Sequence, residues 1–153
     1  MTTSLTWTCN SCVPCVGCGI DSEHIDRFVQ WENSKPDFLP FVFTKSEKSY
    51  CKKLSIPAVG LCAAFCTKEA LRKALHNPYN FTDCEFFYSD DPKKCRFNIS
   101  EDLAALFPDL SYTVKILSPV VLHKKSRGNG NVDTKAGWIK NHVTAIVHAF
   151  ETL

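Results

Sequence analysis

The hydrophobic positions of this 153-residue chain follow a helical spacing in the first half and alternate with polar positions in the second half. Ile25, Phe28 and Val29 stand at positions i, i+3 and i+4, and either Asp21 or Ser22 is placed to cap them. This pattern predicts a helix that begins just after the cap and ends at the sequence NSKP.

Further elements follow from local composition. Residues 61–75 carry a broad apolar face and stop at HNP, which predicts a second helix. Residues 37–44 are apolar and β-prone, but their internal proline confines them to an edge strand or an extended loop. The polar residues 45–53 then form a connection, and residues 84–99 predict a hairpin. A short helix follows, capped by Ser100, with two acids in its first turn.

The last predicted elements are strands. Residues 110–117 alternate, and so do residues 141–150, which place four apolar residues on one face: Val143, Ala145, Val147 and Ala149. Helices early and strands late predict the α+β class with an antiparallel sheet. We expect two parts, a Cys-rich metal-binding module at residues 1–21 and an α+β domain at residues 22–153.

Composition narrows the class of protein. The chain is 44% hydrophobic with a net charge of +2, so it has enough apolar residues for a core and no strong charge for binding nucleic acid. It contains no apolar run of about 18 residues and begins without a secretory signal. We therefore expect a cytoplasmic protein that does not enter membranes, in a reducing compartment where thiols bind metal or do chemistry.

Four of the nine cysteines form a CxxCxxCxxC cluster: Cys9, Cys12, Cys15 and Cys18. One CxxC is the spacing with which two thiolates hold one tetrahedral ion, so the cluster predicts zinc, with an iron–sulfur cluster as the alternative. Two such pairs are crowded around one ion, and one arrangement uses a distant residue as a further ligand. The candidates for that ligand are His24, Cys51, Cys84 and Cys95.

A second candidate site involves the sequence GLCAAFC. If the helix starts near Cys62, the helix dipole favours the thiolate there, and His142 on the last strand is the best candidate for a general base. The alternative is that Cys62 and Cys66 are buried packing residues, as free cysteines often are.

The order of these parts resembles the leader-type papain-like cysteine proteases of viruses, with the arterivirus leader proteins nearest in layout. The resemblance implies that Cys62 is the nucleophile, that His142 is its base, and that the protein cuts once at its own C-terminus, at Leu153. It also implies that the released protein acts on host proteins in the host cytoplasm. Ala63 departs from the family pattern, which has an aromatic residue after the nucleophile.

Two other functions remain open. A zinc-binding viral regulator without enzymatic activity, which binds host factors or suppresses RNA silencing, explains the cysteine cluster without any role for Cys62. Its contact surface would be a basic loop, for which nucleic acid is a weakly supported partner: His123, Lys124, Lys125 and Arg127. The third function is an NlpC-like hydrolase, in which LCAAFC replaces the usual nucleophile segment.

Overall fold

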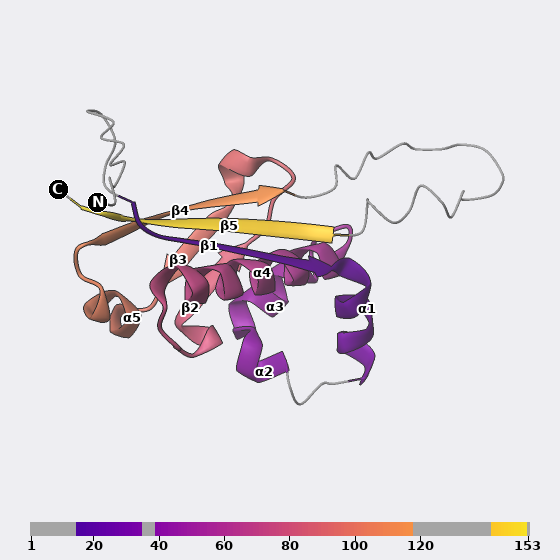
Figure 1. The fold of residues 1–153 in the computed structure, drawn as a ribbon. Coiled ribbons are helices and arrows are strands. Elements are labelled where there is room, and N and C mark those ends of the chain that lie inside the picture. Colours follow the sequence, from indigo (N-terminus) through magenta and orange to yellow (C-terminus); the bar gives the residue numbers. More distant parts are fainter. Residues whose placement is uncertain (1–14, 35–38, 118–141, 153) are drawn as a thin grey trace, which may run out of the picture.

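The computed structural model describes residues 15–34, 39–117 and 142–152 (Figure 1). Its main sheet has three antiparallel strands in the order β1-β5-β4. Their bounds are Cys15–His24 for β1, Leu110–Leu117 for β4 and His142–Glu151 for β5. The last strand of the described chain is therefore the central strand of the sheet, as Figure 1 shows.

Helix α4, Pro57–Leu75, packs against one face of this sheet (Figure 1). Proline is favourable at the first helical position because its missing N–H would have no partner there. The helix ends at His76, which adopts a left-handed conformation with φ 50°. The predicted apolar face of β5 is confirmed, because four of its residues are fully buried on the side of α4: Val143, Ala145, Val147 and Ala149.

Two glycines of β1 let the strand backbone touch α4. A Cβ atom at Gly19 would collide with the Ala70 carbonyl oxygen, and one at Gly17 would collide with that of Ala74. The strand and the helix can therefore approach this closely only where glycine occupies these positions. This approach determines how the residues that follow Gly19 meet the helix.

A second layer covers the side of α4 away from the main sheet. It contains the hairpin of β2 and β3 together with α2 and α3, and Figure 1 shows α1 and α5 at opposite ends of the molecule. The bounds of these elements are Ile25–Ser34 for α1, Leu39–Val42 for α2, Lys45–Cys51 for α3, Cys84–Phe87 for β2, Arg96–Ile99 for β3 and Glu101–Leu106 for α5. The short 3-10 helices η1 and η2 span Phe81–Asp83 and Pro92–Lys94.

Some local predictions differ from the structure. Residues 39–42 form helix α2 rather than an extended segment, since Pro40 lies in the first turn, where proline is tolerated. Residues 45–51 form helix α3 rather than a connection, because Thr44 and Glu47 make a capping box. Helix α4 begins at Pro57, one turn before the predicted start.

The α+β class and the antiparallel sheet are confirmed, but the separate Cys-rich metal-binding module is wrong within the part of the chain that is described. Residues 15–24 form the edge strand β1, so the expected boundary at residue 21 falls inside a strand. Residues 1–14 lie outside the described residues. In the described part, none of the helices has both the length and the apolar character that crossing a bilayer requires.

Candidate active site

Alternation along β1 points one set of side chains at helix α4. Asp21 and Glu23 follow the two contact glycines on this side of the strand. Both carboxylates are mostly shielded from solvent, with 15% of the Asp21 side chain and 24% of the Glu23 side chain exposed. The close contact of strand and helix therefore places two acids against the helix surface.

In the described part of the chain, only one of the two carboxylate oxygens of Asp21 has a hydrogen-bond partner. The Lys73 ammonium on α4 donates to Asp21 Oδ1 at 2.7 Å and to the Ile20 carbonyl oxygen at 2.9 Å. The other oxygen, Asp21 Oδ2, is buried and has no hydrogen-bond partner among the described residues. A buried carboxylate oxygen without a partner is costly, and it is therefore a candidate to receive a cation or a hydrogen-bond donor.

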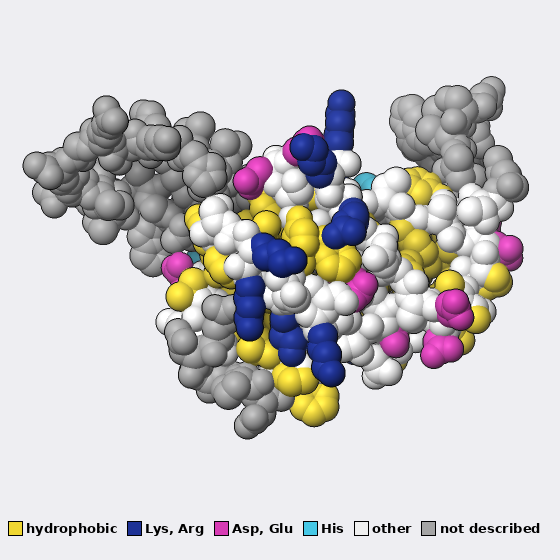
Figure 2. Space-filling model, turned by 180° about the vertical axis from the view of Figure 1, so that it is seen from behind, with side chains coloured by type: hydrophobic (Ala, Val, Ile, Leu, Met, Phe, Trp, Pro, Cys, Tyr) yellow, Lys and Arg dark blue, Asp and Glu magenta, His cyan; other side chains and the backbone are white. Residues whose placement is uncertain are grey.

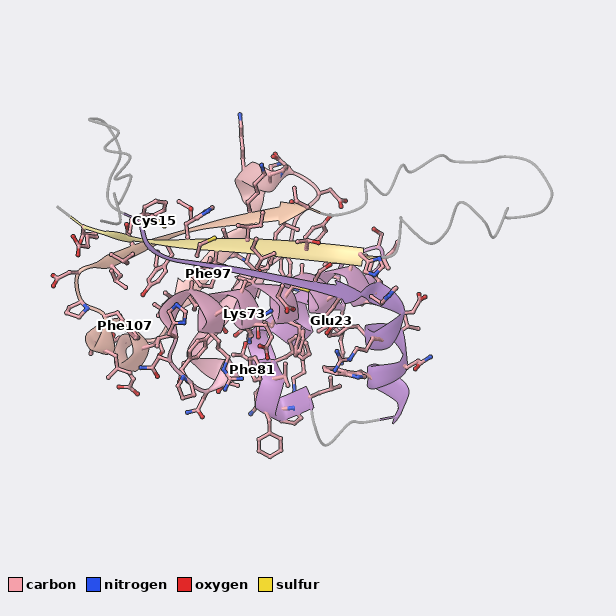
Figure 3. All side chains as sticks on the ribbon, viewed as in Figure 1. Cys15, Glu23, Lys73, Phe81, Phe97 and Phe107 are labelled. Carbon is pink, nitrogen blue, oxygen red and sulfur yellow. The ribbon has the colours of Figure 1, made fainter. Side chains whose placement is uncertain are left out.

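More charged groups stand on the neighbouring turns of α4. The Arg72 guanidinium lies 3.7 Å from a Glu69 carboxylate oxygen and 4.5 Å from the centre of the Phe81 ring. Figure 3 labels Lys73 below β1, Phe81 beyond it and Glu23 toward the end of the strand. A shallow pocket of about 270 Å³ opens here, lined by Glu69, Arg72, Lys73, His76, Asn77 and Pro78.

This arrangement suits phosphate chemistry. Carboxylate oxygens are hard ligands, and Mg²⁺ is commonly held by one or two carboxylates together with water and substrate phosphates. The described residues contain no group of three or more metal-ligating side chains, and a magnesium site of that kind does not require one. Arg72 and Lys73 add positive charge beside the acids, where a phosphate group would be attracted.

The two sulfur atoms of the predicted nucleophile segment are buried. Cys62 is 0% exposed, and its thiol donates to the Glu23 carbonyl oxygen at 3.5 Å, while the Cys66 thiol donates to that of Val143 at 3.4 Å. The hydrogen bond with Cys62 and burial raise the pKa of the Cys66 thiol far above its usual range. Because α4 begins at Pro57, Cys62 lies beyond the first helical turn, where the dipole has its main effect.

His142 has different surroundings from Cys62. Its neighbour Val143 points at α4, so His142 points to the other face of the sheet. There its ring packs against His24, with 3.6 Å between the ring centres. The fold thus places the two predicted catalytic residues, Cys62 and His142, on opposite sides of the sheet.

The four predicted metal-binding cysteines are only partly described. Cys15 and Cys18 are free, exposed thiols on β1, and Cys9 and Cys12 lie outside the described residues. An extended strand does not form the turn in which a CxxC pair usually holds an ion. The predicted basic loop and Leu153 also lie outside the described residues.

Sequence reasoning misses the acids and cations of this site. The pattern predicts Asp21 as a possible helix cap, but Asp21 lies in β1, and the helix starts at Ile25. Glu69 and Lys73 enter the sequence analysis only as part of a helix. One sequence signal could have pointed to this site. Gly17 and Gly19 stand at alternate positions before Asp21, and glycines in a strand indicate that another backbone approaches closely there.

Comparison with protein families gives a clear match. The model described as "ACPS: 4'-phosphopantetheinyl transferase superfamily" matches residues 17–117, which is more than half of the chain. The holo-[acyl-carrier-protein] synthase of Chlamydia trachomatis serovar L2 is 43% identical over 60 residues, covering 39% of this chain and 50% of the relative. The Syntrophus aciditrophicus enzyme of the same name is 40% identical over 63 residues, covering 39% and 47%. The chain thus spans about half the length of the curated relatives it matches.

Solved structures with the same fold carry the same name. Holo-[acyl-carrier-protein] synthase from Neisseria meningitidis matches with a TM-score of 0.64 at 15% identity, over 90% of this chain and 100% of that one. The Helicobacter pylori enzyme, described in complex with coenzyme A, matches with a TM-score of 0.57 at 21% identity, over 85% and 96%. At these identities the likeness concerns the fold.

These matches overturn several predictions. The resemblance to viral leader proteases is wrong, and so are the self-cleaving protease, the zinc-binding viral regulator and the hydrolase, because the matching family is one of transferases. Zinc, and with it the iron–sulfur alternative, is wrong as the expected cofactor, since the described residues offer no such ligand group and matching structures are described with coenzyme A. The coarser expectation of an enzyme agrees with the family, whereas nothing supports host proteins as partners. The chain belongs to the 4'-phosphopantetheinyl transferase superfamily.

Proposed function

We propose that the chain transfers the 4'-phosphopantetheinyl group of coenzyme A to a hydroxyl group of an acyl carrier protein in the cytoplasm. The family description names the transferred group, and the curated relatives are named for the carrier protein. Structures from Chronobacterium ammoniagenes and Helicobacter pylori are described with coenzyme A. The observation in this chain that carries the proposal is the unpartnered Asp21 Oδ2, in the described part of the chain, beside the Lys73 ammonium.

Mg²⁺, a hard cation that proteins commonly hold with one or two carboxylates and substrate phosphates, fits this site. Asp21 Oδ2 is a buried carboxylate oxygen that lacks a partner among the described residues, and Glu69 supplies a second carboxylate on the adjoining helix. These two residues would hold the ion. When bound, the ion supplies positive charge that neutralises phosphate oxygens and makes the phosphorus easier to attack.

The side chains of the protein would bind the donor phosphates and orient the reacting groups. Lys73 fixes the position of Asp21 and ties β1 to α4, and Arg72 and Lys73 would attract the pyrophosphate of the donor. In the transfer, the carrier oxygen forms a bond to the phosphorus that carries the pantetheine arm. The pyrophosphate bond breaks, 3',5'-ADP leaves, and the hydroxyl proton passes to solvent. Positioning and charge stabilisation account for most catalysis in reactions of this type.

A set of basic side chains elsewhere on the surface also favours a polyanionic donor. Figure 2 shows Lys and Arg side chains gathered on one face of the molecule. Helix α3, the residues after it and the segment of η2 and β3 carry seven such residues, which we call the basic strip: Lys45, Lys48, Lys52, Lys53, Lys93, Lys94 and Arg96. The Arg96 guanidinium lies 5.7 Å from the centre of the Tyr50 ring, which joins β3 to α3. Coenzyme A carries several phosphate charges, and a strip of this sign attracts them.

The test is a transfer assay with coenzyme A, Mg²⁺ and an acyl carrier protein in its unmodified form. We expect the carrier to gain the mass of one phosphopantetheinyl group as 3',5'-ADP appears. In Asp21→Asn the rate should fall by about a hundredfold or more, and the Mg²⁺ concentration for half-maximal rate should rise, because a carboxylate ligand has been lost.

Asp102→Asn is the matched control, since it removes an exposed carboxylate in α5 and should keep the full rate. If the parent protein modifies no carrier protein under any Mg²⁺ concentration, the function is wrong. If the parent is active and Asp21→Asn is equally active with unchanged Mg²⁺ dependence, the transferase function stands but the site is wrong.

A further inference from the structure

The guanidinium group of Arg72 has N–H donors that the fold does not use. A Glu69 carboxylate oxygen lies 3.7 Å from it, which is beyond hydrogen-bond distance, whereas the Lys73 ammonium is 2.7 Å from Asp21. Among the described residues, Arg72 makes no hydrogen bond, although a guanidinium carries five N–H donors. Its side chain is 32% exposed and lines the same shallow pocket as Lys73. These donors are therefore available to a ligand in the pocket.

Two aromatic rings hold the guanidinium in place of hydrogen bonds. Its central carbon lies 4.5 Å from the centre of the Phe81 ring and 5.9 Å from that of the Tyr79 ring. A cation is attracted to the face of an aromatic ring, and the planar guanidinium can stack there while its N–H groups stay free to bind. The rings thus position Arg72 without using its donors.

Both rings are themselves fixed to helix α4, which also carries Arg72. The Phe81 ring is stacked on the buried Phe65 ring, with 5.8 Å between the ring centres and 29° between the planes. The buried Tyr79 hydroxyl donates to the Lys68 carbonyl oxygen at 2.6 Å. Because ring and guanidinium are anchored to one helix, the contact between them is rigid.

We infer that Phe81 is a positioning residue, which holds the Arg72 guanidinium ready to bind the pyrophosphate of coenzyme A. The inference rests on the proposed function, which supplies this donor. Arginine binds phosphate groups through paired N–H donors, and a side chain that is already in position loses less conformational freedom when the ligand arrives. Phe81 would therefore increase donor affinity without touching the donor.

The test measures initial rates of transfer while the coenzyme A concentration is varied at saturating Mg²⁺ and carrier protein. In Phe81→Leu the KM for coenzyme A should rise about three- to tenfold, because the cation–ring attraction and the positioning of the arginine are lost. The kcat should change little, since a contact to the pyrophosphate that is made equally in the ground state and the transition state affects binding alone. Phe81→Tyr keeps the ring face and should keep the parental KM.

A double variant shows whether Phe81 acts through Arg72. Arg72→Gln should raise the KM for coenzyme A by about tenfold or more, because a charged hydrogen-bond donor is lost. Adding Phe81→Leu to Arg72→Gln should raise it no further, since the ring then has no guanidinium to position. Phe97→Leu is the matched control: Phe97 is also a partly buried ring, but it packs on Tyr112 at 6.3 Å, and this variant should keep the parental KM.

Circular dichroism reports whether each variant folds. If Phe81→Leu unfolds, Arg72→Lys replaces it, because lysine keeps the charge but has neither the planar group that stacks on a ring nor the paired donors. It should raise the KM at least as much as Phe81→Leu is expected to. A parental KM in the variant that is measured, or a rise in the double variant as large as the sum of the two single effects on a logarithmic scale, would overturn the inference.

Titration with inorganic pyrophosphate and Mg²⁺ separates this inference from the proposed function, because it requires no transfer. A parent protein that modifies no carrier protein would overturn the function. Pyrophosphate affinity should still be about three- to tenfold weaker in Phe81→Leu than in the parent if the ring positions Arg72. Equal pyrophosphate affinity in the two proteins would contradict that role, whether or not the parent is active.

Discussion

Helix α4 carries two lysines, and each ammonium group lies 2.7 Å from a carboxylate oxygen. Lys68 pairs with Glu47, and both side chains are 0% exposed. Lys73 pairs with Asp21, and 51% of the Lys73 side chain is exposed. The two ion pairs therefore have the same N–O distance, but the Lys68 pair is fully buried and the Lys73 pair is partly exposed to solvent.

The pairs also differ in how completely their hydrogen-bonding groups are used. Glu47 accepts bonds from Lys68 and from the backbone N–H groups of Thr44 and Phe86, and Lys68 also donates to the Val42 carbonyl oxygen. Both carboxylate oxygens of Glu47 thus have partners, whereas Asp21 Oδ2 has none among the described residues.

This difference suits the Lys68–Glu47 pair to a structural role and the Lys73–Asp21 pair to ligand binding. A saturated buried pair joins α3, α4 and β2, and it leaves no group of Glu47 or Lys68 to meet a ligand. In the Lys73–Asp21 pair, Asp21 Oδ2 stays available as an acceptor in the described part of the chain. Lys73 meanwhile holds the carboxylate in place through Oδ1. On this comparison, damage to the Lys68 pair should lower stability, and damage to the Lys73 pair should lower activity.

The largest effect is expected from Lys68→Met. Removing one partner of a buried ion pair leaves an uncompensated charge, which costs about 3–5 kcal/mol of unfolding free energy. Urea denaturation of the parent and the variant measures this loss. The double variant Glu47→Gln with Lys68→Met has no buried charge and should recover at least about 1 kcal/mol. A double variant no more stable than Lys68→Met would show that the stranded charge is not the cause.

The second expected effect is that the stability lost in Lys68→Met depends on pH. Burial raises the pKa of Glu47 above its ordinary value near 4.5, although Lys68 opposes the shift. The folded state then binds more protons than the unfolded state, so the free energy of unfolding falls as pH rises from the unfolded pKa to the folded one. Without Lys68 the folded pKa rises further. The stability deficit of Lys68→Met should therefore be smaller at about pH 5 than at about pH 8 in urea titrations, and a constant deficit would contradict this account.

The smallest effect on stability is expected from Lys73→Met. An ion pair with a half-exposed lysine is worth about 0–1 kcal/mol, because water and salt screen it. The urea midpoint should change little, while transfer activity should fall because Asp21 and the donor phosphates lose a positive charge. Lys115→Met, which removes an exposed lysine from β4, is the control for general loss of a surface charge and should keep its activity. A destabilisation as large as that of Lys68→Met would remove the distinction between the two pairs.

Local patterns predict several elements correctly. The alternation of β5 and the Ser100 cap of α5 depend on neighbouring residues alone, and both are as predicted. Thr44 and Glu47 also form a local signal, a capping box, but the polar composition around them favours a connection and hides it. In the sequence, Cys62 is a candidate nucleophile, with core packing as the alternative for Cys62 and Cys66. In the fold, both thiols are buried between α4 and the sheet.

The pattern of residues is sufficient for the α+β class, the hairpin and the buried face of the last strand, since hydrophobic periodicity and turn residues act over a few positions. The acid that we propose as a metal ligand, Asp21, could be recognised only in the folded chain. Asp21 and Lys73 are 52 residues apart and meet because Gly17 and Gly19 let a strand lie directly on a helix. Burial then removes water from one carboxylate oxygen and leaves it without a partner among the described residues, a condition that depends on the packing of distant segments.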